Sequence, residues 1–299
     1  MNKKIKKLTK NNNYNFFLTI RIYLLIPILL NCFASYYYVL NEIKLLSCFL
    51  ISFSIYLIAA YGFIDNDMID RNIDNINGVF RLQFISDSNL FKLNIIKFIF
   101  LFIAFFIGLL IDIKIFIAFI FISILLFFYN RHIVKKHLYS NLLAAFLSLS
   151  PLWIPLCFFS GYKNIHIKIY YILLIGLLLY LCGREIILDS LDTKGDIIGK
   201  RKTLPIIFGL SKSILIAKIF HYLSLILTTI SFSFLFFFSY YQTYKMFAFI
   251  ILLFLFNFIT FIILNKIKLQ DMNSFNNYIT KSRFVMSLCS VIILLLGWK

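Results

Sequence analysis

Two groups of aspartates have the types and spacing needed for metal or phosphate chemistry, in a chain with only 12 acidic residues among 299. The first group is Asp67, Asp70 and Asp74, at positions i, i+3 and i+7. The second group repeats this spacing with Asp189, Asp192 and Asp196. On a helix, that spacing places three side chains on one face. Two like charges about 4 Å apart repel by about 4 kcal/mol at an effective dielectric near 20, so each group needs cations or basic partners.

Carboxylates that face one another across a gap suit a hard divalent cation. Mg²⁺ uses few protein carboxylates and takes its other ligands from water and substrate phosphates. Two Asp-rich helix ends beside one cavity would therefore suit a diphosphate bridged by Mg²⁺. Basic residues near the two groups would pair with the phosphate oxygens; these are Arg71, Arg81, Lys194 and Lys200. Solvated helix ends are the alternative interpretation, but the matched spacing favours a function.

Two neighbouring features leave their interpretations open. Asp65 precedes the first group and is either an acid that supports the site or a solvated neighbour. The run Lys200-Arg201-Lys202 follows the second group. It either binds an anionic headgroup or substrate phosphate, or anchors the membrane topology.

The composition indicates the kind of scaffold that must hold these residues. The chain is 62% hydrophobic and 14% charged, whereas soluble domains are about half apolar and about a quarter charged. Only helices and closed barrels satisfy their backbone groups in lipid. We therefore expect an all-α, polytopic bundle in the membrane. The net charge of +18 fits basic residues that flank membrane spans better than it fits a nucleic-acid partner. The cysteines and histidines form no motif with metal-ligand spacing.

The hydropathy pattern predicts nine transmembrane helices, since a span needs roughly 20 mainly apolar residues. They are expected near residues 17–40, 43–64, 93–111, 113–129, 138–160, 168–188, 211–238, 243–265 and 281–298. A basic tail, 1–16, precedes one membrane domain, 17–299. Pro151 and Pro155 are expected to kink the fifth helix.

The distribution of basic residues predicts the orientation of this bundle. With the N-terminus in the cytoplasm, only six of the 30 Lys and Arg residues lie on the far side. Those six are Lys44, Lys114, Lys163, Lys168, Lys245 and Lys299. This orientation places the two longest polar loops, about 65–92 and 189–210, on the cytoplasmic side of a cell inner membrane.

The aspartate groups resemble the motifs of one membrane enzyme family. Asn66-Asp67-x-x-Asp70-x-x-x-Asp74 is similar to the NDxxDxxxD motif of the UbiA superfamily of intramembrane prenyltransferases. REIILDSLDTKGDIIGKRKTLPIIFG, residues 184–209, resembles the family's second motif. A weaker third resemblance covers residues 129–145, with Tyr129, Lys135 and Asn141.

The resemblance implies an enzyme that moves an isoprenoid from an allylic prenyl diphosphate to an acceptor, with Mg²⁺. It implies that the prenyl tail lies in an apolar tunnel open to the bilayer. All six aspartates would hold the metal and diphosphate, and Asp67, Asp70, Asp189 and Asp192 would be catalytic. The implied substrate-binding residues are Arg21, Asn66, Arg81, Tyr129, Lys135 and Arg184, and Lys200 joins this set as a basic residue beside the second group.

The second motif most resembles the branch of digeranylgeranylglyceryl phosphate synthases and their bacterial relatives. That branch implies a prenylglyceryl phosphate as the acceptor. The chain departs from the branch pattern at Val79, Leu82 and Leu188, so an aromatic quinone precursor stays open as the acceptor. A secondary transporter or cation channel is the alternative from another class, because acids in membrane proteins also coordinate transported ions.

Overall fold

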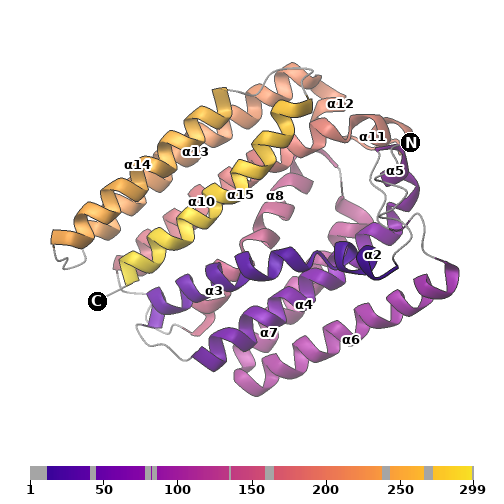
Figure 1. The fold of residues 1–299 in the computed structure, drawn as a ribbon, viewed down its shortest axis with the longest axis horizontal. Coiled ribbons are helices and arrows are strands. Elements are labelled where there is room, and N and C mark those ends of the chain that lie inside the picture. The colour runs from indigo at the N-terminus through magenta and orange to yellow at the C-terminus, as the bar shows by residue number, and fades with distance from the viewer. Residues whose placement is uncertain are drawn as a thin grey trace.

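The computed structural model describes residues 12–40, 45–77, 82, 86–134, 136–158, 165–237, 243–265 and 272–297. Within these ranges the regular elements are all helices, as the composition predicted. Two groups of long helices make up most of the molecule (Figure 1). One group contains α3 (Leu25–Leu40), α4 (Leu45–Ile69), α6 (Asp87–Ile111) and α7 (Ile113–Phe128). The other contains α10 (Ile165–Leu191), α13 (Leu210–Phe237), α14 (Thr243–Asn265) and α15 (Met272–Gly297).

Each group of helices encloses its own apolar core. Ile51, Ile58 and Phe119 belong to the core of the α3–α7 group. Tyr170, Leu177 and Phe256 belong to the core of the α10–α15 group. The groups are joined where α15 packs on α3, and α8 (His137–Ser148) packs against α10 between them (Figure 1).

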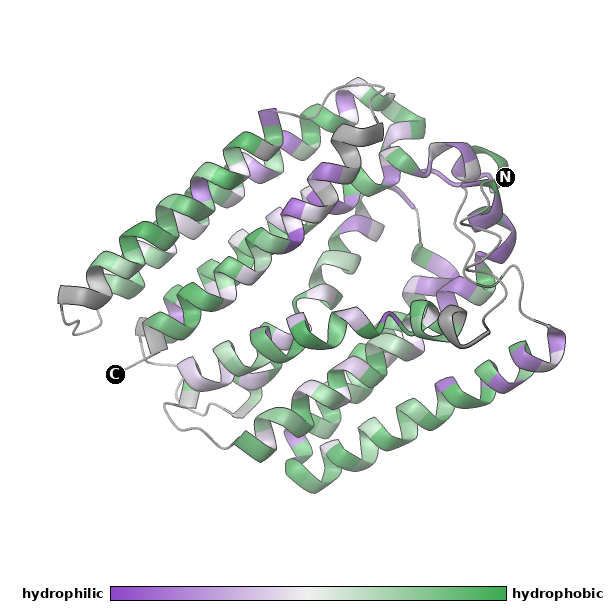
Figure 2. Ribbon diagram, viewed as in Figure 1, coloured by the Kyte–Doolittle hydropathy of each residue, from purple (hydrophilic) through white to green (hydrophobic). Residues whose placement is uncertain are grey.

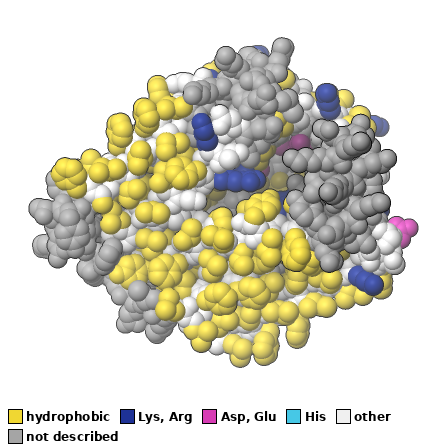
Figure 3. All heavy atoms as spheres, viewed as in Figure 1, with side chains coloured by type: hydrophobic (Ala, Val, Ile, Leu, Met, Phe, Trp, Pro, Cys, Tyr) yellow, Lys and Arg dark blue, Asp and Glu magenta, His cyan; other side chains and the backbone are white. Residues whose placement is uncertain are grey.

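The outer faces of the long helices are apolar. Hydrophobic residues cover most of their length in Figure 2, and hydrophobic side chains cover most of the face drawn in Figure 3. Phe102 and Leu110 of α6, for example, are 72% and 70% exposed. Such surface would be costly in water and is favourable in lipid. The described helices therefore form an integral membrane protein.

Six described helices are long and apolar enough to cross a membrane, or seven if one bent pair forms a single span. The expected count of nine is therefore not confirmed. All nine predicted segments do coincide with helical residues. In α14, however, the apolar stretch Phe247–Ile262 is shorter than the other spans and does not qualify. In α15, the first turns are polar, and the helix does not qualify.

The bent pair is the fifth predicted segment. There α8 ends at Ser148, and α9 (Ser150–Trp153) continues into η3 (Ile154–Phe158) after a bend of 48°. Pro151 stands in the first turn of α9, where a missing N–H costs nothing, and it prevents α8 from continuing straight. The predicted kink at Pro151 is confirmed.

Apart from α9 and η3, the short helices gather at one end of the molecule, where the ribbon in Figure 2 is also most hydrophilic. They are α2 (Asn12–Thr19), η1 (Ile22–Leu24), α5 (Arg71–Ile76), η2 (Tyr129–Ile133), α11 (Thr193–Ile198) and α12 (Leu204–Phe208). We call this the polar end; α5, α11 and α12 lie at the right of Figure 1.

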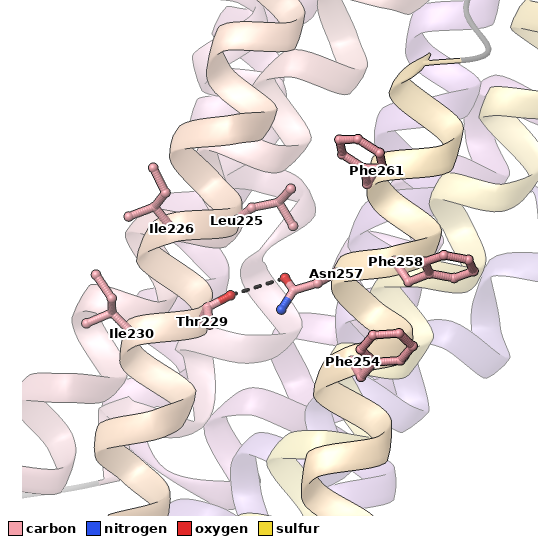
Figure 4. A pocket seen from close by; sticks show the side chains of 8 residues that line it. All are labelled: Leu225, Ile226, Thr229, Ile230, Phe254, Asn257, Phe258 and Phe261. Carbon is pink, nitrogen blue, oxygen red and sulfur yellow. Dashed lines mark hydrogen bonds between the residues drawn. The ribbon is translucent and has the colours of Figure 1, made fainter.

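An apolar groove of about 580 Å³ separates α13 from α14. Phe254, Phe258 and Phe261 belong to its lining. In Figure 4 the side chains of Thr229 and Asn257 point toward each other from the two helices, and the hydroxyl donates to the amide oxygen over 3.1 Å. This hydrogen bond satisfies two polar groups within an otherwise apolar lining.

Candidate active site

Both aspartate groups fold in the same way, across a break between a long helix and a short one. Asp70 separates α4 from α5 with φ −90° and ψ 4°, and Asp192 separates α10 from α11 with φ −90° and ψ 3°. Backbone hydrogen bonds continue through both breaks, from Asp74 N to Asp70 O at 2.8 Å and from Asp196 N to Asp192 O at 3.0 Å. The i, i+3, i+7 spacing therefore spans two helices joined at a bend, rather than one straight helical face.

The two groups are brought together because α5 packs against α11. The Asn77 amide oxygen, just after α5, accepts a hydrogen bond from the Gly195 backbone N–H over 2.8 Å. Arg201 then bridges the groups. Its guanidinium donates to Asp70 Oδ1 and lies 3.5 Å from Asp196 Oδ1. Asp70 and Asp196 are 3% and 0% exposed, so the arginine charge compensates two carboxylates that are shielded from water.

Gly195→Ala should separate the two groups, because the new Cβ would lie 2.6 Å from the Asn77 amide atoms. Overpacking of this kind costs about 1–3 kcal/mol, and here it also removes the Asn77–Gly195 hydrogen bond. We expect a lower unfolding temperature for this variant in detergent. The double variant Gly195→Ala/Asn77→Ala should recover part of the loss, because it removes the clash. No recovery would show that Asn77 is not the obstacle.

Asp189 is held by a residue of the third sequence resemblance. Asn141 of α8 donates from Nδ2 to Asp189 Oδ2 over 2.8 Å. Asn141 is 2% exposed, and its amide oxygen is buried without a hydrogen-bond partner among the described residues. Buried amide oxygens are normally satisfied, so this atom is available to a donor that enters the site.

Asp67 is paired with Arg21, from the segment between α2 and α3. The Arg21 guanidinium lies 3.2 Å from Asp67 Oδ1 and 4.0 Å from the centre of the Phe63 ring. Arg21 adopts a left-handed backbone conformation, with φ 50°. A non-glycine residue in this region costs free energy and is frequent at functional sites. The strained backbone directs the arginine onto the first aspartate group.

The other predicted residues occupy different positions around the two groups. Tyr129 lies within electrostatic reach of Asp70, Asp189 and Arg201. Arg184 donates to its neighbour Glu185 over 2.7 Å. Asn66 contributes its backbone oxygen to the break, where it accepts from Asp70 N over 2.8 Å. Five predicted residues remain. Asp74 and Asp192 are partly exposed, and Lys200 is exposed. Arg81 and Lys135 lie outside the described residues.

The donor set of the two groups consists of carboxylates, the hard ligands that Mg²⁺ prefers. In the part of the chain that the structure describes, no three Asp, Glu, His or Cys side chains form a ready-made metal site. This agrees with a Mg²⁺ that would take most of its ligands from phosphate and water. The contacts of Arg201 with Asp70 and Asp196 show that positive charge fits between the two groups.

Asp65 lies in a buried network that the sequence did not predict. It is 1% exposed, so the interpretation as a solvated neighbour is wrong. Lys97 of α6 donates to Oδ1 over 2.9 Å, and Arg131 of η2 binds both carboxylate oxygens at 2.7 and 3.1 Å. Asn130 also donates to this carboxylate, over 3.2 Å. Lys97 was the available signal, because it lies farthest along α6 of that helix's three charged residues, where the sequence is otherwise apolar, and charges in such a position require a partner.

Comparison with known proteins identifies the scaffold. The model of the UbiA prenyltransferase family matches residues 24–288. The digeranylgeranylglyceryl phosphate synthase of Sulfurisphaera tokodaii is 32% identical over 212 residues, which are 68% of this chain and 73% of that synthase. The synthase of the same name from Saccharolobus solfataricus is 32% identical over 177 residues, which are 59% of this chain. That match spans 62% of the Saccharolobus synthase, less than two thirds of its length.

Solved structures share the fold. A digeranylgeranylglyceryl phosphate synthase structure has a TM-score of 0.67 at 22% identity, covering 95% of this chain and 97% of that chain. A UbiA homologue from Archaeoglobus fulgidus bound to DMAPP and Mg²⁺ has a TM-score of 0.65 at 17% identity, covering 93% and 99%. The family model covers most of the chain, and the fold agrees over nearly its full length. The chain belongs to the UbiA prenyltransferase family.

Proposed function

We propose that this protein transfers a prenyl group from an allylic prenyl diphosphate to a lipid acceptor in the membrane, with Mg²⁺. The observation that carries the proposal is the convergence of two aspartate groups at the polar end of a UbiA-type bundle. There Arg201 contacts one carboxylate from each group, Asp70 and Asp196. The family membership favours prenyl transfer over the transporter or channel that acids in a membrane protein also suggest.

The six aspartates Asp67, Asp70, Asp74, Asp189, Asp192 and Asp196 are the proposed metal ligands. Bound Mg²⁺ would supply a Lewis acid for the diphosphate oxygens. We assign the catalytic contacts to Asp67, Asp70, Asp189 and Asp192. The assignment draws on the motif resemblance and on the α5–α11 packing that brings the groups together.

The proposed substrate-binding residues are polar side chains around the aspartates. Arg21, Arg184 and Lys200 would pair with the diphosphate, and Arg21 already lies 3.2 Å from Asp67. Tyr129 and Asn66 would donate to its oxygens. Arg81 and Lys135 are proposed for the same role from the sequence alone.

The reaction itself breaks one carbon–oxygen bond and forms another bond to the same carbon. The bond between the allylic carbon and the diphosphate breaks, and its electron pair leaves with the diphosphate. The acceptor forms a bond to that carbon and releases its proton to the diphosphate or to water. Arginine and lysine stabilise the negative charge that develops on the leaving group. The apolar helices around the site exclude water that would otherwise capture the allylic cation.

A glyceryl phosphate lipid is the acceptor we propose, because two relatives at 32% identity are named digeranylgeranylglyceryl phosphate synthases. The departures at Val79, Leu82 and Leu188 keep an aromatic quinone precursor as the second candidate. Prenyl transfer by the purified protein to a panel of both acceptor types, with labelled prenyl diphosphates and Mg²⁺, tests the proposal. Transfer to the glyceryl phosphate lipid is expected. No transfer to any acceptor with any prenyl diphosphate would overturn the proposed function.

We also propose nine membrane spans, with the N-terminus and the site on the cytoplasmic side of the inner membrane. The basic residues of the polar end support this orientation, because Lys and Arg accumulate in cytoplasmic segments. The basic tail 1–16 would lie on the same side, before a single domain from 17 to 299. Single cysteines introduced at the end of α11 and at the start of α14, in a cysteine-free background, should react with membrane-impermeant maleimide from opposite sides. Labelling from one side would contradict the nine-span count.

A further inference from the structure

A second cavity at the polar end is lined mainly by basic residues. Its volume is about 380 Å³, and its lining is Val134, Lys136, His137, Gly199, Lys200, Arg201 and Lys202. We call this the basic cleft. Four of the seven residues carry a fixed positive charge, and none of the seven is acidic. Side chains of one charge repel when they share a small volume, so an anion would be favourable there.

The basic cleft is built from two segments that are far apart in sequence. The chain around the start of α8 supplies Lys136 and His137, and the connection between α11 and α12 supplies Lys202. The two segments are joined by backbone contacts: Lys136 pairs with Lys202 as an isolated parallel bridge, and His137 N donates to Lys202 O over 2.7 Å. These contacts hold the cations together, whereas a topology anchor would need only their presence on one side of the membrane.

The backbone of the basic cleft is also strained. Two of its residues, His137 at φ 52° and Lys200 at φ 51°, adopt the left-handed region. Residues held in such conformations cluster at binding and active sites, because the surrounding structure must over-determine them. Both strained residues belong to the lining of this one cavity.

Arg201 connects the basic cleft to the aspartate groups. The same residue lines the cleft and contacts Asp70 and Asp196. The cleft therefore begins one side chain away from the proposed diphosphate site. A ligand in the cleft would place its neighbouring atoms close to the proposed diphosphate site.

We propose that the basic cleft binds the phosphate group of the acceptor lipid; this rests on the proposed function. A phosphate monoester carries more charge than a single carboxylate and offers three acceptor oxygens, which match several lysine ammonium groups. Binding the phosphate here fixes the attacking group of the lipid next to the prenyl diphosphate. The cleft thus selects acceptors that carry a phosphate over neutral or aromatic ones.

The kinetic test uses Lys136→Gln/Lys202→Gln, with Lys212→Gln as the matched control. Lys212 is an exposed lysine in the first turn of α13, outside the lining. The double variant should raise KM for a prenylglyceryl phosphate by about 10- to 100-fold, the range of charge-assisted hydrogen bonds. The KM for the prenyl diphosphate should stay within about twofold of wild type, and so should the kinetics with the dephosphorylated prenylglycerol. The unfolding temperature should stay within a few degrees of wild type.

Two results would overturn the inference. A raised KM for the prenyl diphosphate, with the acceptor KM unchanged, would assign the cleft to the donor. Unchanged kinetics for both substrates would show that the lysines serve only to orient the protein in the membrane.

Native mass spectrometry in detergent tests the cleft without turnover, so it separates failure of the cleft from failure of the proposed function. Wild-type protein and Lys212→Gln should retain dioleoylglycerol phosphate in preference to dioleoylglycerol. Lys136→Gln/Lys202→Gln should lose this preference. Retention of the preference in the double variant would contradict the inference, even if the wild-type protein transferred no prenyl group.

Discussion

Replacing either Asp67 or Asp192 by Asn is expected to reduce prenyl transfer by at least about 10²- to 10³-fold, as for the removal of other preorganised electrostatic groups. The substitution keeps the size of the side chain and removes its charge. Each group of aspartates is proposed to hold the diphosphate and Mg²⁺ from one side, so a loss in either group should lower kcat/KM. Initial rates with a labelled prenyl diphosphate at saturating Mg²⁺ measure this.

Asp87→Asn is the matched control for these two variants. Asp87 begins α6, is exposed and lies outside both groups. Its rate should stay within about twofold of wild type, and all three variants should remain folded at the temperature of the assay. Wild-type rates in both Asp67→Asn and Asp192→Asn would contradict the proposal that these aspartates are metal ligands.

The second large effect is expected in stability, at Asp65. Asp65→Ala removes the carboxylate that Lys97 and Arg131 share. The Lys97 side chain is only 7% exposed, so its charge would remain in an apolar helix interface without compensation. Breaking a buried ion pair in this way costs about 3–5 kcal/mol. Thermal unfolding in detergent should therefore show a large decrease for Asp65→Ala.

A double variant separates this loss of charge balance from the loss of packing. Asp65→Asn/Lys97→Met removes one charge of each sign, and the remaining Arg131 side chain is 34% exposed and can reach solvent. Replacing buried ion pairs by uncharged side chains of similar size is often neutral. We expect the double variant to be more stable than Asp65→Ala. Equal stability of the two would show that the charges contribute little.

The sequence predicted the scaffold well, because lipid restricts the possible structures. Long apolar segments in a membrane must be helical, and every predicted segment overlaps at least one described helix. The number of spans was predicted less well, because the apolar stretch of α14 is short and the first turns of α15 are polar. Hydropathy alone does not show how far such helices enter the bilayer.

The aspartate spacing predicted that the two groups belong together, but not how they meet. The helix breaks at Asp70 and Asp192 could not be recognised from the sequence. Both residues are N-caps, and aspartate is common at the N-cap of any helix. The contact of Arg201 with both groups joins residues 131 positions apart in the sequence. Arg201 lies between two lysines, so its separate role was hidden in a basic run.

The Asp65 network shows the same limit of sequence reasoning. Asp65, Lys97 and Arg131 lie on three different elements, and each alone resembles a charge near the end of a span. Only the packing of α4, α6 and η2 shows that they form one buried group. Ion pairs between distant segments depend on tertiary packing, which local patterns do not specify.

Binding of a non-hydrolysable prenyl thiodiphosphate tests most directly whether the two aspartate groups form one site. Isothermal titration calorimetry of the purified protein should show binding that requires Mg²⁺. Asp67→Asn and Asp192→Asn should each weaken it by at least about tenfold, and Asp87→Asn should leave it unchanged. Binding that is independent of Mg²⁺, or that survives a substitution in one of the two groups at wild-type affinity, would contradict a shared site.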